Sequence, residues 1–280
     1  MTFSNTSRTV LAMRRSGFTL IELLVVIGII SVVIAVLMPY LHRFRLQAKT
    51  AVCMSNVRQL NLALSTYIND NGRFPYGFDN TPNQPPAGGY AGHIQYDRTG
   101  WWWFDYLEGL YNKSMGRKTV LQCPSNQLKD TKLEGDILCG NYGVNLSICK
   151  MFWGLTNQKE FVGEPRASTE IPHSSQTLLL VDSGYAIINW WHAIDIPPVT
   201  LSATMIEDTA YIPSLSINRG RQLWSEQKID AYYGRHPRMT VNVGFGDGHV
   251  ARTKAEDLLV KKIADNHYEN RSPLWTPDSK

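Results

Sequence analysis

A lone carboxylate in an apolar segment is the residue of this 280-residue chain that most needs a chemical explanation. Residues 18–41 are almost uniformly apolar, and as a helix they would cross the roughly 30 Å hydrocarbon core of a bilayer. Glu22 lies inside this segment, near its start. A charged side chain within a membrane span costs about 2.5 kcal/mol or more on insertion scales. Glu22 is therefore expected to meet a cation.

The residues before the apolar segment set its expected orientation. They include Arg8, Arg14 and Arg15 and no acidic residue. The positive-inside rule places such a basic end in the cytoplasm, so the chain after residue 41 is expected outside it. The formal net charge is +4, and removal of residues 1–17 takes away three positive charges and leaves +1. A nearly neutral chain does not predict nucleic-acid binding.

The residues at the start of the segment form a specific motif. The sequence GFTLIEL, residues 17–23, resembles the processing site of type IV prepilins and of type II secretion pseudopilins. The resemblance implies that a membrane aspartyl peptidase cleaves after Gly17 and then methylates the new amino group of Phe18. It also implies that Glu22 meets this amine on a neighbouring subunit of a filament. Two groups that are costly alone in apolar surroundings would neutralise each other there.

A signal peptide or an ordinary membrane anchor explains fewer features of the apolar segment than the pilin resemblance does. A secretory signal peptide would end in a small-x-small cleavage site, but Met38 is followed by Pro39 and Tyr40. An ordinary single-pass anchor leaves Glu22 without a role. The pilin resemblance further implies that the stretch between Gly28 and Pro39 can melt and extend in the filament. A simple proline kink is the alternative.

Beyond residue 41 the pattern becomes one-sided, which is typical of an amphipathic helix. The apolar residues that recur at spacings of three, four or seven are Leu46, Cys53, Val57, Leu60, Leu64, Tyr67 and Ile68. The residues mostly elsewhere on the helical wheel are Arg43, Lys49, Arg58 and Asn61. Asn71-Gly72, with Pro75 shortly after, predicts the helix end. The sequence TYINDNGRFP, residues 66–75, resembles the helix end of major pseudopilins.

We divide the chain into a leader (residues 1–17), a transmembrane or filament-core helix (18–41), its amphipathic continuation (42–70) and a globular domain (71–280). The predicted fold class is α+β, with the long N-terminal helix packed on a globular domain that contains an antiparallel sheet.

Short strands and turns are predicted within the globular domain. Apolar runs bounded by turn formers predict strands at residues 119–124, 141–145 and 177–182. Asp247-Gly248 between alternating runs predicts a two-residue hairpin. A capping box at residues 253–256 predicts a short helix to about residue 265. Residues 72–100, rich in Gly, Pro and Asn, are expected to form a surface connector.

A second resemblance covers the globular domain. The order of Cys53, Cys123, Asp182, His236 and Asp247-Gly248 is similar to that in a large family of pilin-like proteins of planctomycete and lentisphaeral bacteria. That family ends in a histidine, about nine residues, and then Asp-Gly. Here ten residues separate His236 from Asp247, so a fixed geometry between the two does not follow from the motif.

Clustered tryptophans raise the possibility of a ligand surface. Trp101 and Trp102, with Trp190 and Trp191, could form an aromatic platform that stacks on sugars or another flat ligand. Three adjacent tryptophans at residues 101–103 cannot all face inward in a regular helix or strand, so one of them is expected at the surface. The alternative, which we favour, is that these rings form the core or contacts between subunits.

Four cysteines follow the apolar segment: Cys53, Cys123, Cys139 and Cys149. An oxidising compartment permits disulfides, and four cysteines allow three pairings. We predict Cys53 with Cys123 and Cys139 with Cys149. Buried free thiols are the alternative.

Catalysis and metal binding receive little support from the sequence. The chain contains no Gly-x-Ser-x-Gly, no His-Glu-x-x-His and no phosphate-binding glycine loop, so an enzyme is not predicted. His236, Asp247 and His249 are of metal-ligating types, but the turn alone explains Asp247. No cofactor or metal ligand is therefore assigned. Some secretion pseudopilins bind calcium, for which only Asp182 and Asp247 are candidates here.

The predicted function is that of a pilin-like or pseudopilin structural subunit. It would be processed by prepilin peptidase, cross the inner membrane and its lipid once, and carry its globular domain in the periplasm. Copies of itself, other pilin-like subunits and an inner-membrane assembly platform would be its partners in a type II secretion pseudopilus or a type IV pilus-like filament. The alternative is a binding module for glycans or adhesion on a pilin-type anchor.

Overall fold

The computed structural model describes residues 19–80, 100–107, 120–128, 138–152, 159–196 and 210–277. The expected leader, with the cleavage site between Gly17 and Phe18, lies outside the described residues. The chain divides into two compact units, Met1–Arg45 and Leu46–Lys280.

A single helix, α1 (Leu20–Asn71), accounts for most of the described first unit and continues into the second. Its end is as predicted, because Gly72 adopts a positive φ of 76° and donates its N–H to the carbonyl of Ile68 at 2.8 Å. Pro39 lies within the helix and does not end it.

From Leu46 onward α1 belongs to the second unit and packs within it as its pattern predicts. Cys53, Val57, Leu60, Leu64 and Ile68 are buried, whereas Arg43, Lys49 and Arg58 are exposed. Asn61 was predicted to lie off this stripe, but it is fully buried, because it follows Val57 by four residues and precedes Leu64 by three. Its amide donates to the carbonyls of Phe245 (3.1 Å) and His249 (3.2 Å), so the helix is tied to the end of a hairpin by a polar side chain.

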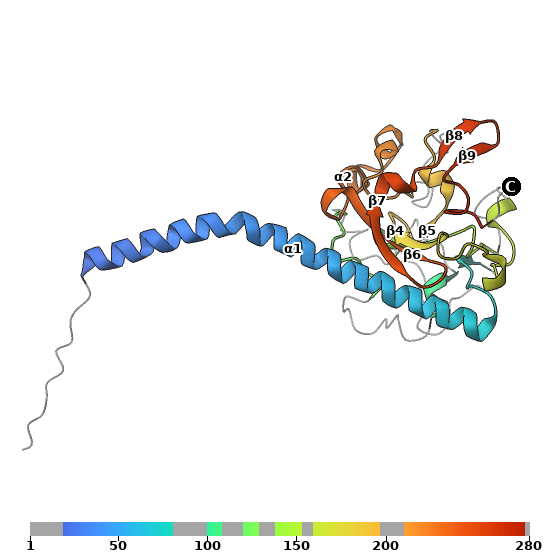
Figure 1. The fold of residues 1–280 in the computed structure, drawn as a ribbon, viewed down its shortest axis with the longest axis horizontal. Coiled ribbons are helices and arrows are strands. Elements are labelled where there is room, and N and C mark those ends of the chain that lie inside the picture. Colours follow the sequence, from blue (N-terminus) through green and yellow to red (C-terminus); the bar gives the residue numbers. More distant parts are fainter. Residues whose placement is uncertain are drawn as a thin grey trace, which may run out of the picture. The chain divides into compact units, whose positions relative to one another are not determined.

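The core sheet has five strands in the order β5-β3-β4-β6-β7. Figure 1 labels β4, β5, β6 and β7 of this sheet. The strands are β3 (Tyr142–Asn145), β4 (Leu178–Asp182), β5 (Ile187–Ile188), β6 (Thr240–Phe245) and β7 (Val250–Lys254). Three of its four pairings are antiparallel, as expected, but β5 runs parallel to β3. The sheet is therefore mixed rather than antiparallel throughout.

Gly143 explains how β5 reaches the far side of β3. The chain between β4 and β5 passes so close to β3 that a Cβ on Gly143 would lie 2.6 Å from the carbonyl oxygen of Tyr185 and 2.9 Å from Cβ of Ser183. Only glycine leaves room for this crossing. The crossing then allows Val144 to pair with Ile187 in parallel register.

The β6–β7 hairpin was predicted, but its turn is longer than expected. Phe245 donates its N–H to the carbonyl of His249 at 3.0 Å, which leaves three residues in the loop. Gly248 adopts a φ of 96° and donates to the carbonyl of Phe245 at 3.0 Å. This is the three-residue loop in which a type I turn is followed by a left-handed glycine.

Smaller elements complete the domain. They are β1 (Phe78–Asp79), β2 (Trp101–Trp102), α2 (Ser225–Tyr233), β8 (Lys261–Ala264) and β9 (His267–Glu269). β1 pairs with β2 and β8 with β9, each in an antiparallel two-stranded sheet.

Three local predictions were wrong. The expected strand at 119–124 is a series of turns in its described part. The connector is not all at the surface, because residues 77–79 are buried. The helix expected to reach residue 265 is a short 3₁₀ helix, Ala255–Leu258, and β8 follows it. Its capping acid is Asp257 rather than Glu256, and it accepts the N–H of Lys254 at 3.2 Å.

Candidate functional site

The described chain begins with a reciprocal cap at the start of α1. Glu22 Oε2 accepts the backbone N–H and the hydroxyl of Thr19, both at 2.8 Å, and the hydroxyl of Thr19 accepts the N–H of Glu22 at 3.3 Å. Thr-x-x-Glu is a capping-box pattern, which satisfies N–H groups that have no partner within the helix. Glu22 thus has a structural role within its own subunit, which was not predicted from the sequence.

The rest of the first half of α1 presents apolar side chains to its surroundings. Its large hydrophobic residues from Leu20 to Leu41 are all exposed in the single chain, and Glu22 is the only charged residue among them. Among the described residues, α1 is the one helix long and apolar enough to cross a membrane. A Cβ built on Gly28 meets no other atom within 4 Å, so the helix surface is open there.

The tryptophans form the core rather than an exposed platform. Trp102 and Trp103 are both buried, which adjacent residues achieve because the chain leaves β2 and enters a short 3₁₀ helix between them. Trp101 is partly buried and packs against Tyr106 with ring centroids 5.3 Å apart. Trp190 is buried and stacks on partly buried Trp191 at 4.4 Å. The favoured alternative, core packing, is what these contacts support.

All four cysteines are buried and none forms a disulfide, so neither predicted disulfide is present in the structure. Cys53 and Cys123 nevertheless meet, because their Sγ atoms lie 2.8 Å apart and share a hydrogen bond. Cys139 and Cys149 are not bonded to each other. The predicted Cys53–Cys123 pair is therefore in contact without a covalent bond.

His236 lies beside these two thiols beneath α1. Its Nε2 is 3.0 Å from Asp182 Oδ2 and 3.0 Å from Asn242 Nδ2, and its Nδ1 is 3.2 Å from the hydroxyl of Thr50 on α1. Asp182 Oδ2 also accepts the backbone N–H of Asn242 at 2.6 Å. The imidazole is thus held between the last residue of β4 and the side of the long helix.

The buried cluster changes the acidity of its members. The hydrogen bond from Cys123 lowers the pKa of Cys53 to about 7, although burial and the charge of Asp182 act in the opposite direction. Burial, followed by the bond to Cys53, raises the pKa of Cys123 well above its ordinary value. Burial lowers the pKa of His236, but the charge and hydrogen bond of Asp182 outweigh it and give a net increase. The shared hydrogen bond therefore makes Cys53 the more acidic of the two thiols.

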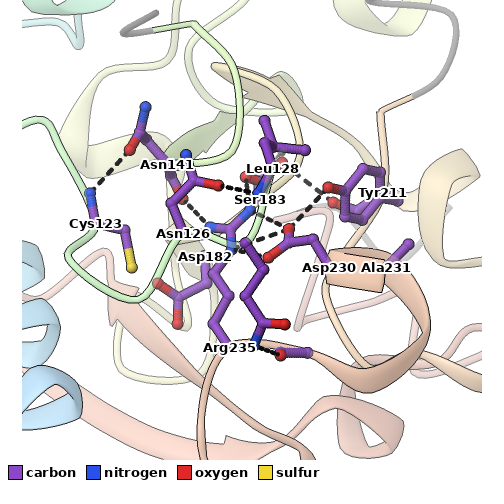
Figure 2. Close-up of polar contacts among 12 residues, drawn as sticks. Cys123, Asn126, Leu128, Asn141, Asp182, Ser183, Tyr211, Asp230, Ala231 and Arg235 are labelled. Carbon is purple, nitrogen blue, oxygen red and sulfur yellow. Dashed lines mark hydrogen bonds and ion pairs between the residues drawn. The ribbon is translucent and has the colours of Figure 1, made fainter. Parts of the chain in front are cut away.

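A second buried network lies next to this cluster and holds Arg235 (Figure 2). The guanidinium donates from Nε to Asp230 Oδ1 at 2.8 Å and from an amino nitrogen to Asp230 Oδ2 at 2.7 Å. Its remaining donors reach the carbonyls of Asn141 (2.7 Å) and Ser183 (2.8 Å). Tyr211 completes the network by donating its hydroxyl to Asp230 at 2.7 Å. This pair joins α2 to the residue before β3 and to the residue after β4.

Cys53, Cys123 and His236 are also the described residues whose ligand atoms, all within 4.8 Å of one another, could hold a metal ion. No metal ligand was assigned from the sequence, and the motif partner Asp247 is elsewhere. Asp247 accepts the backbone N–H of His249 at 3.0 Å on the hairpin and lies 2.6 Å from its ring. The three ligands are far apart in the sequence, so only the fold brings them together.

These features define a class of protein: a membrane-anchored chain whose long N-terminal helix has an exposed apolar half with one carboxylate near its start and an amphipathic half packed on an α+β domain. A family model described as the prokaryotic N-terminal methylation motif matches residues 12–38. The chain is 33% identical over 99 residues to the type II secretion system core protein G of Aeromonas hydrophila. That alignment covers 31% of this chain and 69% of the relative. The chain therefore belongs to the type IV pilin-like (pseudopilin) family. No solved structure matches it.

Proposed function

We propose that this protein is a structural subunit of a pilin-like filament. It is cleaved after Gly17, methylated on Phe18, and assembled through the apolar half of α1. The observation that carries the proposal is the exposure of that half, which offers no charged group except Glu22. An apolar surface of this size is stable only in lipid or against other helices.

Glu22 supplies the registration of one subunit against the next. In the filament its carboxylate pairs with the amine of Phe18 on a neighbouring subunit. The two charges neutralise each other only when the two subunits are correctly aligned. The relative's printed name, a type II secretion core protein, supports a secretion pseudopilus as the system served. The orientation follows the basic leader, with the domain after residue 45 outside the cytoplasm. The role is structural rather than catalytic.

The proposal is tested by co-expressing the full chain with and without a prepilin peptidase and weighing the product by mass spectrometry. We expect loss of residues 1–17 and one added methyl group only when the peptidase is active. Gly17→Val should block cleavage, whereas Ser16→Ala, one residue away, should leave it unchanged. An intact leader in the presence of active peptidase would refute the proposal.

The buried tryptophans remove the main support for a glycan-binding module, so no second function is proposed.

A further inference from the structure

We propose that Cys53, Cys123 and His236 form a zinc site that fastens α1 to the globular domain. The first argument is convergence of ligands. One thiol comes from the helix, the other from the turn region before β3, and the imidazole from the segment that follows α2. Each of the three side chains is buried, and all the ligand atoms lie within 4.8 Å of one another.

The hydrogen bonds of His236 assign which nitrogen binds. Nε2 faces Asp182 Oδ2 at 3.0 Å, while Nδ1 faces α1, where Thr50 lies one helical turn before Cys53. Metal-binding histidines ordinarily donate their other N–H to a carboxylate, which fixes the tautomer and orients the ring. Asp182 occupies that position here, and it leaves Nδ1 on the side of the helix that carries the first thiol.

An unpartnered oxygen supplies the second, independent observation. Asp182 is fully buried, and its Oδ1 accepts no hydrogen bond from the described residues. In Figure 2 the Asp182 carboxylate points toward the Cys123 sulfur. A buried carboxylate oxygen with nothing to bind is costly, and a cation beside it removes that cost. Asp182 can therefore orient His236 through Oδ2 and place its negative charge near the cation, while the fourth position on the metal stays open.

The donor set selects the metal. Two sulfurs and one imidazole nitrogen suit a tetrahedral zinc ion, whereas calcium and magnesium require oxygen ligands. Two thiolates on a tetrahedral zinc lie about 3.7 Å apart, from a zinc–sulfur distance of about 2.3 Å. The sulfurs, now 2.8 Å apart, would have to separate by about 1 Å, which small side-chain rotations allow. Zinc binds thiolates, so binding releases the protons that the two thiols carry in the free cluster.

The consequence is a metal clasp between distant segments. The segments that zinc would join are 70 residues apart from Cys53 to Cys123, and Thr50 on the same helix is 186 residues from His236. Because the ligands meet only in the folded chain, zinc stabilises the packing of α1 on the domain.

The test uses the full chain in detergent, purified under reducing conditions, treated with a chelator, and titrated with zinc chloride or cobalt chloride alone. We expect one zinc per chain. Cobalt should give thiolate-to-metal charge-transfer absorption and the intense visible bands of a tetrahedral site. These cobalt bands are measured on the unaltered chain, so they do not depend on whether a variant folds.

A matched pair of variants locates the site. Cys53→Ser should weaken zinc binding on the order of 100-fold or more, because it removes a ligand. Cys149→Ser makes the same chemical change at a buried cysteine outside the cluster and should bind zinc as the unaltered chain does. Equal losses in both variants, or no stoichiometric zinc in the unaltered chain, would overturn the proposal. So would a Cys53–Cys123 disulfide found by mass spectrometry in protein isolated from cells without reductant.

Discussion

The two roles of Glu22, as a helix cap and as a charge, can be separated by two substitutions. Glu22→Gln removes the charge but keeps an oxygen that can accept the two bonds from Thr19, since glutamine also serves in a capping box. Thr19→Ala removes the hydroxyl that accepts the N–H of Glu22, yet leaves the carboxylate charged. One variant therefore tests the ion pair and the other tests the cap.

The two losses differ in size. Losing a capping side chain costs about 1 kcal/mol, which is less than a tenfold change in an equilibrium constant. Removing Glu22's charge leaves the partner amine unpaired in apolar surroundings, at a cost of about 3 to 5 kcal/mol. This corresponds to roughly 10²- to 5 × 10³-fold weaker association of each subunit. Assembly should therefore fail in Glu22→Gln and persist in Thr19→Ala.

The assay is the amount of subunit in filaments sheared from cells, quantified by immunoblot against the total. Mass spectrometry of the membrane fraction checks that both variants are cleaved and methylated, so that a loss of filaments reflects assembly rather than processing. If Glu22→Gln assembles normally while Thr19→Ala does not, the carboxylate acts only as a cap and the reasoning is refuted.

Three further predictions concern the domain, each measured by denaturant unfolding of the full chain in detergent. Burial and a nearby cation lower the pKa of His192 to about 3. The free energy of unfolding should therefore fall as pH drops from about 6.5 towards 3, by up to about 1 kcal/mol per pH unit after allowance for partial exposure. His192→Asn should reduce this dependence on pH. Arg235→Lys should cost about 3 kcal/mol, because lysine cannot supply the planar donors, whereas exposed Arg252→Lys should change stability by less than about 0.5 kcal/mol. Gly143→Ala should cost about 1 to 3 kcal/mol through its clash, whereas Gly220→Ala meets no atom within 4 Å and should be nearly neutral. A similar effect in each variant and its control, or the same pH dependence with and without His192, would contradict these expectations.

Local signals in the sequence predicted the elements that depend on neighbouring residues. Asn71-Gly72 marked the end of α1 because a left-handed cap favours glycine there. The alternating runs around Asp247-Gly248 predicted β6 and β7, and the apolar runs predicted β3 and β4. The amphipathic stripe of α1 correctly identified the residues that pack on the domain.

Contacts between distant segments were beyond the reach of these signals. Asn61 lies on the buried face of α1, and the carbonyls at the end of the hairpin are the partners that its polar side chain needs there. The parallel strand β5 depends on the close passage of the chain between β4 and β5 over Gly143. No local sequence pattern predicts this passage. The same is true of the cluster around His236, since its thiols come from segments 70 residues apart. Cys53 was paired with Cys123 from the sequence, but the position of His236 beside them was not predicted.

The central claim is that the Glu22 carboxylate meets the Phe18 amine of a different subunit. Zero-length carbodiimide cross-linking of filaments grown from equal amounts of ¹⁴N- and ¹⁵N-labelled chains tests it most directly. Peptides joined through Phe18 and Glu22 should then include pairs that carry one label of each kind. Linked peptides that always carry a single label would show that the contact lies within one chain and would contradict the account.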